Sequence, residues 1–236
     1  MEGFDHIARN LESIYHRIEA ACRRAGRDPR EVTLIAVTKT VTAKEVLAAY
    51  RYGVRHFGEN RVEEALPKIA EFQQMLSAGE PAPTWHMIGH LQRRKVRDAM
   101  PAFDIVHSVD TVRLAAEMSK RLEPLGKEMP ILLEVNISGE ASKYGFAPAD
   151  VPAAVEEILQ MPHLSIRGLM TMAPIVAHAE DARPYFVKLR ALRDELAARY
   201  PEVQWSELSM GMSDDFEPAV EEGATMVRIG RAIFQP

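Results

Sequence analysis

The sequence contains a single cysteine, Cys22, and this scarcity excludes two kinds of structure. One cysteine cannot close an intramolecular disulfide, and it cannot supply a cysteine-rich metal site. Cys22 lies in a segment whose apolar residues have helical spacing, so we interpret it as a packing residue. We predict no bound metal.

Long apolar runs are also absent from the sequence. No run approaches the roughly 20 residues that a helix needs to cross a bilayer. Residues 1–6 lack the order of basic and then apolar residues that marks a signal peptide. We therefore expect a soluble cytoplasmic protein without a membrane partner.

An excess of one charge is missing as well. The 236 residues include 29 Lys and Arg and 34 Asp and Glu, interspersed along the chain, which gives a net charge of −5. This balance gives no reason to expect nucleic acid as a partner. We interpret one basic cluster as a solvated helix face, with nucleic-acid binding as the weaker alternative. It comprises Arg93, Arg94, Lys95 and Arg97.

The sequence does contain a regular alternation of strand and helix patterns, with an apolar fraction of 47% that suits a real core. An amphipathic helix is predicted first, over residues 7–18, and ends at the breaker residues 26–29. Eight strands are predicted at 33–37, 54–58, 84–89, 103–109, 129–137, 164–170, 204–210 and 225–229. Helices are predicted at 42–50, 62–69, 91–100, 110–122, 150–160, 182–200 and 213–223. Thr42 with Glu45, and later Asp110, are the expected caps of their helices.

Strict alternation of strands and helices implies parallel strands, and eight of them imply closure into a barrel. We therefore predict a single (β/α)8 TIM-type barrel with an extra N-terminal helix, occupying residues 1–236 as one domain. The alternative is an open doubly wound sheet, which normally begins with a Gly-rich turn after its first strand. Here that turn is Thr38-Lys-Thr-Val41, which contains no glycine. The barrel is favoured.

Lys39 follows the uncharged run 33–37, which is typical of a strand buried on both faces. A lysine in this place is expected at the rim of the core, in partly desolvated surroundings. Because desolvation disfavours the ammonium form, such a lysine can become a nucleophile towards carbonyl compounds. Considered alone, a surface lysine on a strand-to-helix loop is the commoner interpretation.

The loops after the last two strands contain a second group of candidate residues. In (β/α)8 barrels the site lies at the C-terminal ends of the strands, and these two loops often hold phosphate. Residues 209–215 form a small turn into a helix start, where backbone N–H groups and hydroxyls can bind an anion. Alternatively, Ser213 caps its own helix.

Arg228 lies on the eighth predicted strand, two residues before Gly230, which lets the backbone approach a ligand closely. A charge on a barrel strand is costly without a partner, so Arg228 should face an anion or a ring nitrogen. The alternative is an ion pair with Glu134 or another acid at the rim. Closure of the barrel makes Lys39 and these loops neighbours, and an aldehyde that carries a phosphate ester would bridge them.

Several motifs, spread over essentially the full chain, resemble the motifs of one family. They are Val37-Thr-Lys-Thr40, His56-Phe-Gly-Glu-Asn60, Trp85-His-Met-Ile-Gly-His-Leu-Gln92 with Lys95, Ser142-Lys-Tyr-Gly145, Gly168-Leu-Met170, Leu208-Ser-Met-Gly-Met-Ser-Asp-Asp215 and Arg228-Ile-Gly230. The chain resembles the pyridoxal 5′-phosphate (PLP) homeostasis proteins, also called PLP-binding proteins. Their fold is like the N-terminal barrel of alanine racemase.

The resemblance implies a Schiff base between Lys39 and PLP. It also implies phosphate contacts from Ser213 and from the backbone around Gly230 and Arg231, with Ser209 as a further candidate. Arg228 would approach the pyridine nitrogen and keep it unprotonated, because a permanent cation opposes a second positive charge. An unprotonated ring is a poorer electron sink for carbanion chemistry.

Other implied site residues are Asn60, His86 and Met170, near the cofactor ring. Lys143 matches a second lysine at the mouth of the family's site, a candidate secondary site in cofactor transfer. Two departures from the family stand out: Arg231 replaces a threonine found in many members, and the sequence stops at Phe234-Gln-Pro236, where relatives have Phe-Gly and a short tail.

We assign no catalytic or metal-binding role to four of the histidines. His86 and His90 are four residues apart but fall on a strand and a turn, so we interpret them as a rim residue and a turn residue. His56 and His107 are interpreted as satisfied core or rim histidines.

Three functions compete. The first is a non-catalytic carrier that binds PLP reversibly and serves vitamin B6 homeostasis, with PLP-dependent apoenzymes as candidate recipients. The second is a PLP-dependent amino acid racemase or decarboxylase. Alanine racemase takes its tyrosine base from an additional β domain, which we do not expect because the sequence ends six residues after Gly230. The third is a class I aldolase, for which no acid/base set is evident. We favour the carrier, assign no catalytic residue, and expect a monomer or weak dimer.

Overall fold

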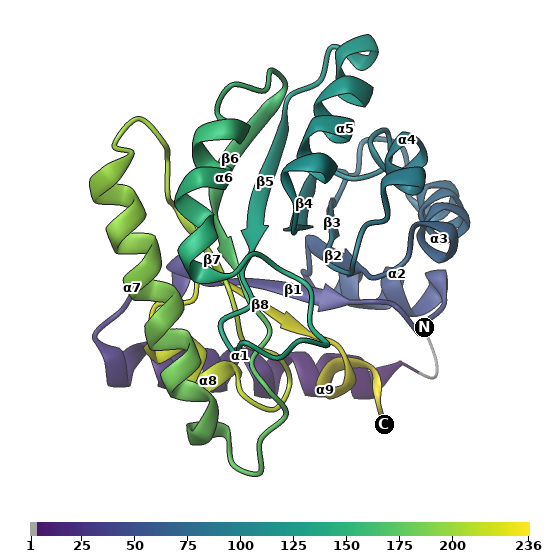
Figure 1. Ribbon diagram of the computed structural model, residues 1–236. Coiled ribbons are helices and arrows are strands. Elements are labelled where there is room, and N and C mark those ends of the chain that lie inside the picture. Colours follow the sequence, from purple (N-terminus) through teal and green to yellow (C-terminus); the bar gives the residue numbers. More distant parts are fainter. Residues whose placement is uncertain (1–3) are drawn as a thin grey trace.

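The eight predicted strands form a closed parallel barrel in the order β1 to β8, with β8 paired to β1, in a computed structural model that describes residues 4–236 (Figure 1). The strands are β1 (Thr33–Val37), β2 (His56–Glu59), β3 (Thr84–Met87), β4 (Ile105–Val109), β5 (Met129–Glu134), β6 (Leu164–Met170), β7 (Glu207–Ser209) and β8 (Met226–Ile229). The prediction of a (β/α)8 barrel is therefore confirmed.

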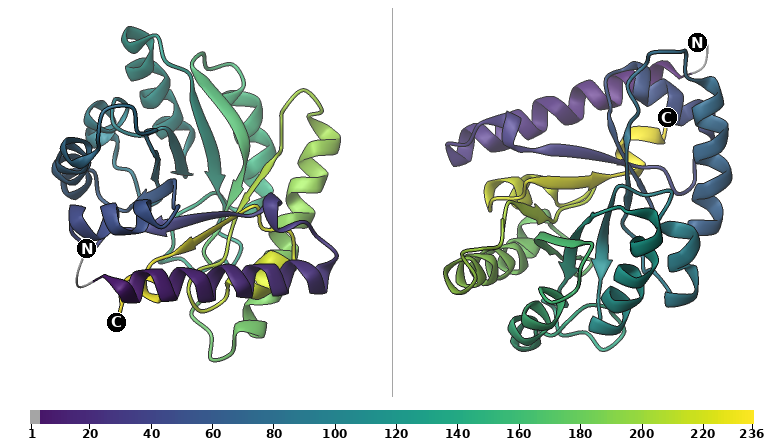
Figure 2. Two further views of the ribbon diagram at one scale, coloured as in Figure 1. Left: turned by 180° about the vertical axis from the view of Figure 1, so that it is seen from behind. Right: turned by 90° about the horizontal axis from the view of Figure 1, so that it is seen from above.

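The helices surround the barrel, and α1 lies along the side formed by β1 and β8 (Figure 2). They are α1 (Asp5–Ala25), α2 (Ala43–Arg51), α3 (Val62–Met75), α4 (Val96–Ala99), α5 (Val112–Leu122), α6 (Val151–Ile158), α7 (Arg183–Arg199), α8 (Phe216–Glu221) and α9 (Arg231–Phe234). The predicted extra N-terminal helix is present as α1, and its apolar face is buried against α8 and α9. None of the helices formed by residues 4–236 combines the length and the apolar character that a membrane crossing requires.

Local capping signals account for some helix boundaries and fail for others. Thr42 and Glu45 form the predicted capping box at the start of α2. Asp110 does not cap α5, because Thr111 accepts the hydrogen bond from the Leu114 N–H instead. Ser213 lies before α8 and does not cap it, since the helix begins only at Phe216.

The predicted helix over residues 91–100 is shorter in the structure. It consists of a 3₁₀ turn, Arg93–Lys95, followed by α4. Pro101 follows directly after Met100 and has no N–H to donate to a helical carbonyl, so the helix cannot continue through it. The chain therefore leaves the helix early and enters β4.

The buried residues form two cores because side chains alternate along each strand. Leu34 and Ala36 of β1 belong to the large core between the strands and the helices, whereas Ile35 points into the barrel. The apolar core inside the barrel is small: Ile35, Ile105, Leu132, Met170 and Met226. The remaining interior is polar, because buried His86, His107, Ser209 and Arg228 also lie on the strands. This polar interior leads to the candidate site.

Gly168 occupies an irregularity in β6, where the register with β5 shifts by one residue. Its φ of +155° is a conformation that other residues rarely adopt. A Cβ atom at this position would lie 1.8 Å from the carbonyl oxygen of Glu207 on β7. Only glycine therefore lets β6 and β7 pair here.

We predict that Gly168→Ala destabilises the protein by about 3 kcal/mol, because both the backbone angle and the space oppose a methyl group. Urea unfolding of the ligand-free protein measures the change. Gly26→Ala is the matched control, since Gly26 also has a positive φ of 67° but has no atom within 4 Å of an added Cβ. Equal losses in the two variants would contradict the steric argument.

Candidate functional site

Lys39 lies in the turn that follows β1, and its side chain is exposed. The prediction of partly desolvated surroundings is therefore wrong. The turn connects the C-terminal end of β1 to α2. The Lys39 amine is accessible to a ligand that enters the C-terminal end of the barrel.

Thr38, the residue before this lysine, is fixed by buried hydrogen bonds. Thr38 is fully buried and donates through its hydroxyl to Oε1 of Glu59 at 2.6 Å. Lys68 of α3 donates to the same carboxylate oxygen at 2.8 Å and also to the Thr38 carbonyl. Glu59 is fully buried and Lys68 is largely buried, and the hydrogen bonds between them and to Thr38 are charge-assisted, so they fix the backbone from which Lys39 projects. A charged residue at the end of a buried strand, Glu59, was the signal in the sequence for this support.

The loops after β7 and β8 meet, as predicted. The hydroxyl of Ser213 accepts a hydrogen bond from the Ala232 N–H at 3.5 Å. Arg231 and Asp214, both exposed, form an ion pair across the same two loops. A Cβ atom on Gly230 would lie 3.2 Å from the Val37 carbonyl oxygen, so the second loop lies directly against the end of β1. The predicted phosphate-binding segments and the lysine loop are therefore neighbours.

Arg228 is only 4% exposed, and its guanidinium points into the barrel. It donates to the Ser209 hydroxyl at 2.6 Å and to the Thr171 carbonyl at 2.9 Å. The alternative of an ion pair with Glu134 is wrong, because no carboxylate lies within ion-pair distance of Arg228 among residues 4–236. Burial lowers the pKa of Arg228 to about 10, against the opposing effect of Asp215 and Glu134, so the group stays cationic at neutral pH.

Ser209 is fully buried, with its hydroxyl between Arg228 and the ring of His107. It therefore lies beneath Arg228 and apart from the two loops that could hold a phosphate. The other candidate phosphate groups, Ser213 and the backbone at 230–232, are at the surface of the barrel end.

The three residues predicted near a cofactor ring occupy different depths. Asn60 is half-buried after β2, and its Oδ1 has no hydrogen-bond partner among residues 4–236. Met170 ends β6 in the apolar core inside the barrel. His86 is not at the rim: it is 1% exposed, lies inside the barrel, and its pKa is lowered by burial to about 3.

An acidic group that sequence reasoning did not assign to the site lies at the end of β5. Glu134 is 3% exposed, and burial together with Asp110 raises the pKa of its carboxyl to about 7, against the opposing effect of Arg228. Asp110 pairs with His90, whose ring is stacked at 3.7 Å on Tyr144 from the loop after β5. Lys143, next to that tyrosine, pairs with Glu140 of the same loop at 2.7 Å.

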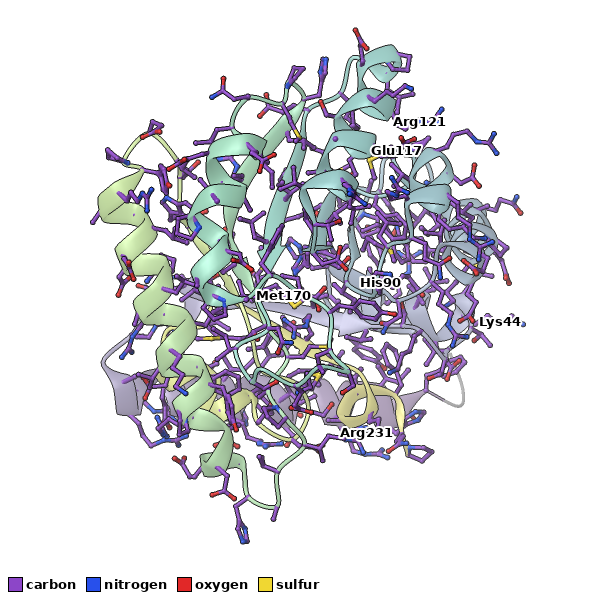
Figure 3. The ribbon with its side chains drawn as sticks, viewed as in Figure 1. Lys44, His90, Glu117, Arg121, Met170 and Arg231 are labelled. Atoms are coloured by element: carbon purple, nitrogen blue, oxygen red, sulfur yellow. The ribbon has the colours of Figure 1, made fainter. Side chains whose placement is uncertain are left out.

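Figure 3 labels Met170 near the centre of the view, His90 to its right and Arg231 on α9 below. These residues come from the ends of β6, β3 and β8, so the C-terminal ends of strands that are distant in the sequence enclose one region. Within residues 4–236, no group of three or more His, Cys, Asp or Glu side chains could hold a metal ion.

Comparisons with known proteins agree with this architecture. Residues 9–236 match the family model described as the alanine racemase N-terminal domain. An alanine racemase of Clostridium difficile 630 superposes with a TM-score of 0.68 at 15% identity, over 97% of this chain and 56% of that one, and this likeness shows the fold alone. The fold and site define a barrel of the alanine racemase N-terminal type.

Two relatives are much more similar. A pyridoxal phosphate homeostasis protein of Aquifex aeolicus (strain VF5) is 42% identical over 99% of this chain and 98% of its own length. The structure of PipY from Synechococcus elongatus PCC7942 with PLP bound has a TM-score of 0.82 and 38% identity, over 97% of this chain and 99% of that one. The chain belongs to the family of pyridoxal phosphate homeostasis proteins.

The buried acid at the end of β5 gives a testable pH dependence. Because the pKa of Glu134 is raised from 4.5 to about 7 in the folded state, folding favours its protonated form. Its contribution to stability is full below the unfolded pKa and is lost as the pH rises towards about 7. We predict that Glu134→Gln raises the free energy of unfolding by about 1–3 kcal/mol above this range and changes it little below.

Urea unfolding of the ligand-free protein at about pH 5 and about pH 8 measures both values. Glu128→Gln is the control, since Glu128 is exposed just before the same strand and should change neither value. An equal effect of Glu134→Gln at both pH values would show that burial does not perturb this carboxyl.

Proposed function

We propose that the protein binds PLP through a Schiff base on Lys39 and acts in cytoplasmic PLP and vitamin B6 homeostasis without catalytic turnover. In this proposal the chain is one PLP-binding barrel domain, and PLP-dependent apoenzymes are candidate recipients of the cofactor. The observation that carries the proposal is a buried cation, Arg228, that has no carboxylate partner among residues 4–236 and lies beside the lysine-bearing strand. Such a cation is suited to a ligand with an acceptor atom.

The residues present fit the three functional groups of PLP. Lys39 offers an exposed amine for the aldehyde. Ser213 and the backbone N–H groups of Gly230 and Arg231 offer neutral donors for the phosphate, on loops that already contact each other. Arg228 uses two of its five N–H groups within the protein, so three remain for the pyridine nitrogen. Asn60 and Met170 supply a free amide oxygen and an apolar surface for the ring.

The identity of the residue at the ring nitrogen favours a carrier over an enzyme. PLP supplies an aldehyde for amines and, when its ring nitrogen is protonated, an electron sink for carbanions. Arg228 can donate a hydrogen bond to that nitrogen, but as a cation it opposes its protonation. The site therefore favours reversible binding over carbanion chemistry. The names of the relatives and the PLP bound to PipY support the same function.

A PLP-dependent racemase or decarboxylase is the second candidate, and one observation favours it. Glu134 has a pKa raised to about 7 by burial and by Asp110, which is the range of an effective general acid or base. Turnover assays with the loaded protein and a panel of amino acids decide between the two functions. The proposal expects no racemisation or decarboxylation above that of free PLP.

We predict that Lys39→Ala abolishes the covalent attachment of PLP, because the other amine at the end of β1, that of Lys68, is held in an ion pair with buried Glu59. The measurement is the visible imine band, followed by borohydride reduction and mass spectrometry of the modified peptide. In the wild type the reduced adduct should map to Lys39. Lys44→Ala is the matched control, since Lys44 is exposed on the next helix and should leave band and adduct unchanged (Figure 3).

An unchanged band in Lys39→Ala, with the adduct on another lysine, would overturn the assignment of Lys39. Absence of any band in the wild type after addition of PLP would overturn the binding proposal itself. A full band accompanied by amino acid turnover would replace the carrier by the enzyme.

We further predict that Lys143→Ala slows the transfer of PLP to an apoenzyme while the Lys39 adduct remains intact. Lys143 is partly exposed beside Tyr144, in the loop after β5. The Lys143 side chain is 22% exposed, and the loss of one charge contact at the rim is worth about 1 kcal/mol, so we expect a decrease of up to about fivefold in rate. Lys188→Ala on α7, exposed on the outer face, is the control. Equal rates in the two variants would remove Lys143 from the transfer step.

A further inference from the structure

A line of hydrogen-bonded side chains crosses the interior of the barrel. Its links are His56 Nδ1 to His86 Nε2 at 3.0 Å, His86 Nδ1 to His107 Nε2 at 2.8 Å, His107 Nδ1 to Ser209 Oγ at 2.8 Å, and Arg228 Nη1 to Ser209 Oγ at 2.6 Å. The members come from β2, β3, β4, β7 and β8, so the line spans the barrel. Only His56 at its far end is partly exposed.

The hydrogen bonds of this line can be donated in only one direction, from Ser209 towards His56. A guanidinium cannot accept a hydrogen bond, so Ser209 must accept from Arg228. The hydroxyl of Ser209 is fully buried, and its proton has one remaining partner, Nδ1 of His107. If His107 donated instead, this hydroxyl proton would have no acceptor among residues 4–236, at a cost of about 1–3 kcal/mol.

The same tautomer then follows at each ring. With Nδ1 accepting, His107 carries its proton on Nε2 and donates it to Nδ1 of His86. His86 in turn donates from Nε2 to Nδ1 of His56. The remaining N–H of His56 is at the partly exposed end, where Glu207 is the neighbouring charged residue. Every member is thereby satisfied with all three histidines neutral.

With this direction of donation, the acceptor nitrogen of each histidine ring faces the Arg228 side of the line. Each ring presents its lone pair on the side of Arg228 and its N–H on the side of His56. Hydrogen bonds aligned in this way polarise one another, which strengthens Ser209 as an acceptor. The line thus supplies part of the stabilisation that a carboxylate would otherwise give to the buried guanidinium of Arg228.

We propose that His56, His86 and His107 are positioning residues, which act through Ser209 to fix the charge and orientation of Arg228 towards the ligand. For the ligand this inference rests on the proposed function, because the pyridine nitrogen of PLP is the group that Arg228 would meet. The arrangement of the histidines themselves is independent of any ligand. Burial lowers the pKa of all three rings, consistent with their neutral forms.

The first test uses the ligand-free wild-type protein, so it does not depend on PLP. Two-dimensional NMR that correlates ring nitrogens with ring protons reports the tautomer of each histidine. We expect His86 and His107 to be neutral near pH 7 with the proton on Nε2. A proton on Nδ1 of either ring would overturn the directed line, whether or not the protein binds PLP.

The second test measures PLP affinity and the visible spectrum of the loaded protein. His107→Leu removes both links at the centre, and we expect PLP to bind about tenfold more weakly, with a changed imine band. His107→Gln presents an amide acceptor and donor in place of the ring, and we expect recovery to within about threefold of the wild type. Ser108→Ala is the matched control, since this adjacent buried hydroxyl has no hydrogen-bond partner among residues 4–236.

Wild-type affinity and spectrum in His107→Leu would overturn the proposal. An equal loss in His107→Leu and His107→Gln would also overturn it, because packing alone would then explain the effect. If His107→Leu does not fold, His56→Leu replaces it at the partly exposed end of the line, with an expected loss of about threefold. Failure of the wild type to bind PLP would refute the proposed function, and the NMR result would still decide the arrangement of the histidines.

Discussion

The burial of the Arg228 guanidinium is the constraint on which the rest of the site depends. A charge inside a closed barrel is tolerated only where polar groups replace the lost water. Here the replacement comes from a hydroxyl, a backbone carbonyl and the histidines behind the hydroxyl. None of these groups carries a negative charge, so the cation keeps its field, and three of its N–H groups have no partner among residues 4–236. A carboxylate in their place would neutralise the site.

Barrel closure explains why this cation and Lys39 can act on one ligand. Arg228 is paired in register with Ile35 on β1, and Lys39 follows four residues later, in the turn after that strand. The backbone contact between Gly230 and the end of β1 brings the loop after β8 to the same place. An amine, a set of neutral N–H donors and a cation thus surround one small region. Their chemistry matches an aldehyde, a phosphate and a ring nitrogen.

The balance between carrier and enzyme rests on two opposing features of the same pocket. Arg228 opposes protonation of a ring nitrogen and so disfavours carbanion chemistry. Glu134, across the barrel end, is buried strongly enough to hold a proton near neutral pH. The loop with Tyr144 and Lys143 is stacked onto His90 next to this acid. In proposing a carrier we give more weight to Arg228, which would act directly on the ring nitrogen, than to Glu134, which favours turnover.

The sequence by itself determined the barrel and the residues that meet at its open end. The alternation of apolar runs with helical spacing is a local property, and eight such units can close in one way, which places Lys39 beside the loops after β7 and β8. Only the tertiary structure decided which side chains point inward, because a shift of one residue reverses the faces of a strand. His86 therefore lies inside instead of at the rim, and Ser209 beneath Arg228. Partner choice, such as Asp110 with His90, depends on elements far apart in the chain, and no local pattern encodes it.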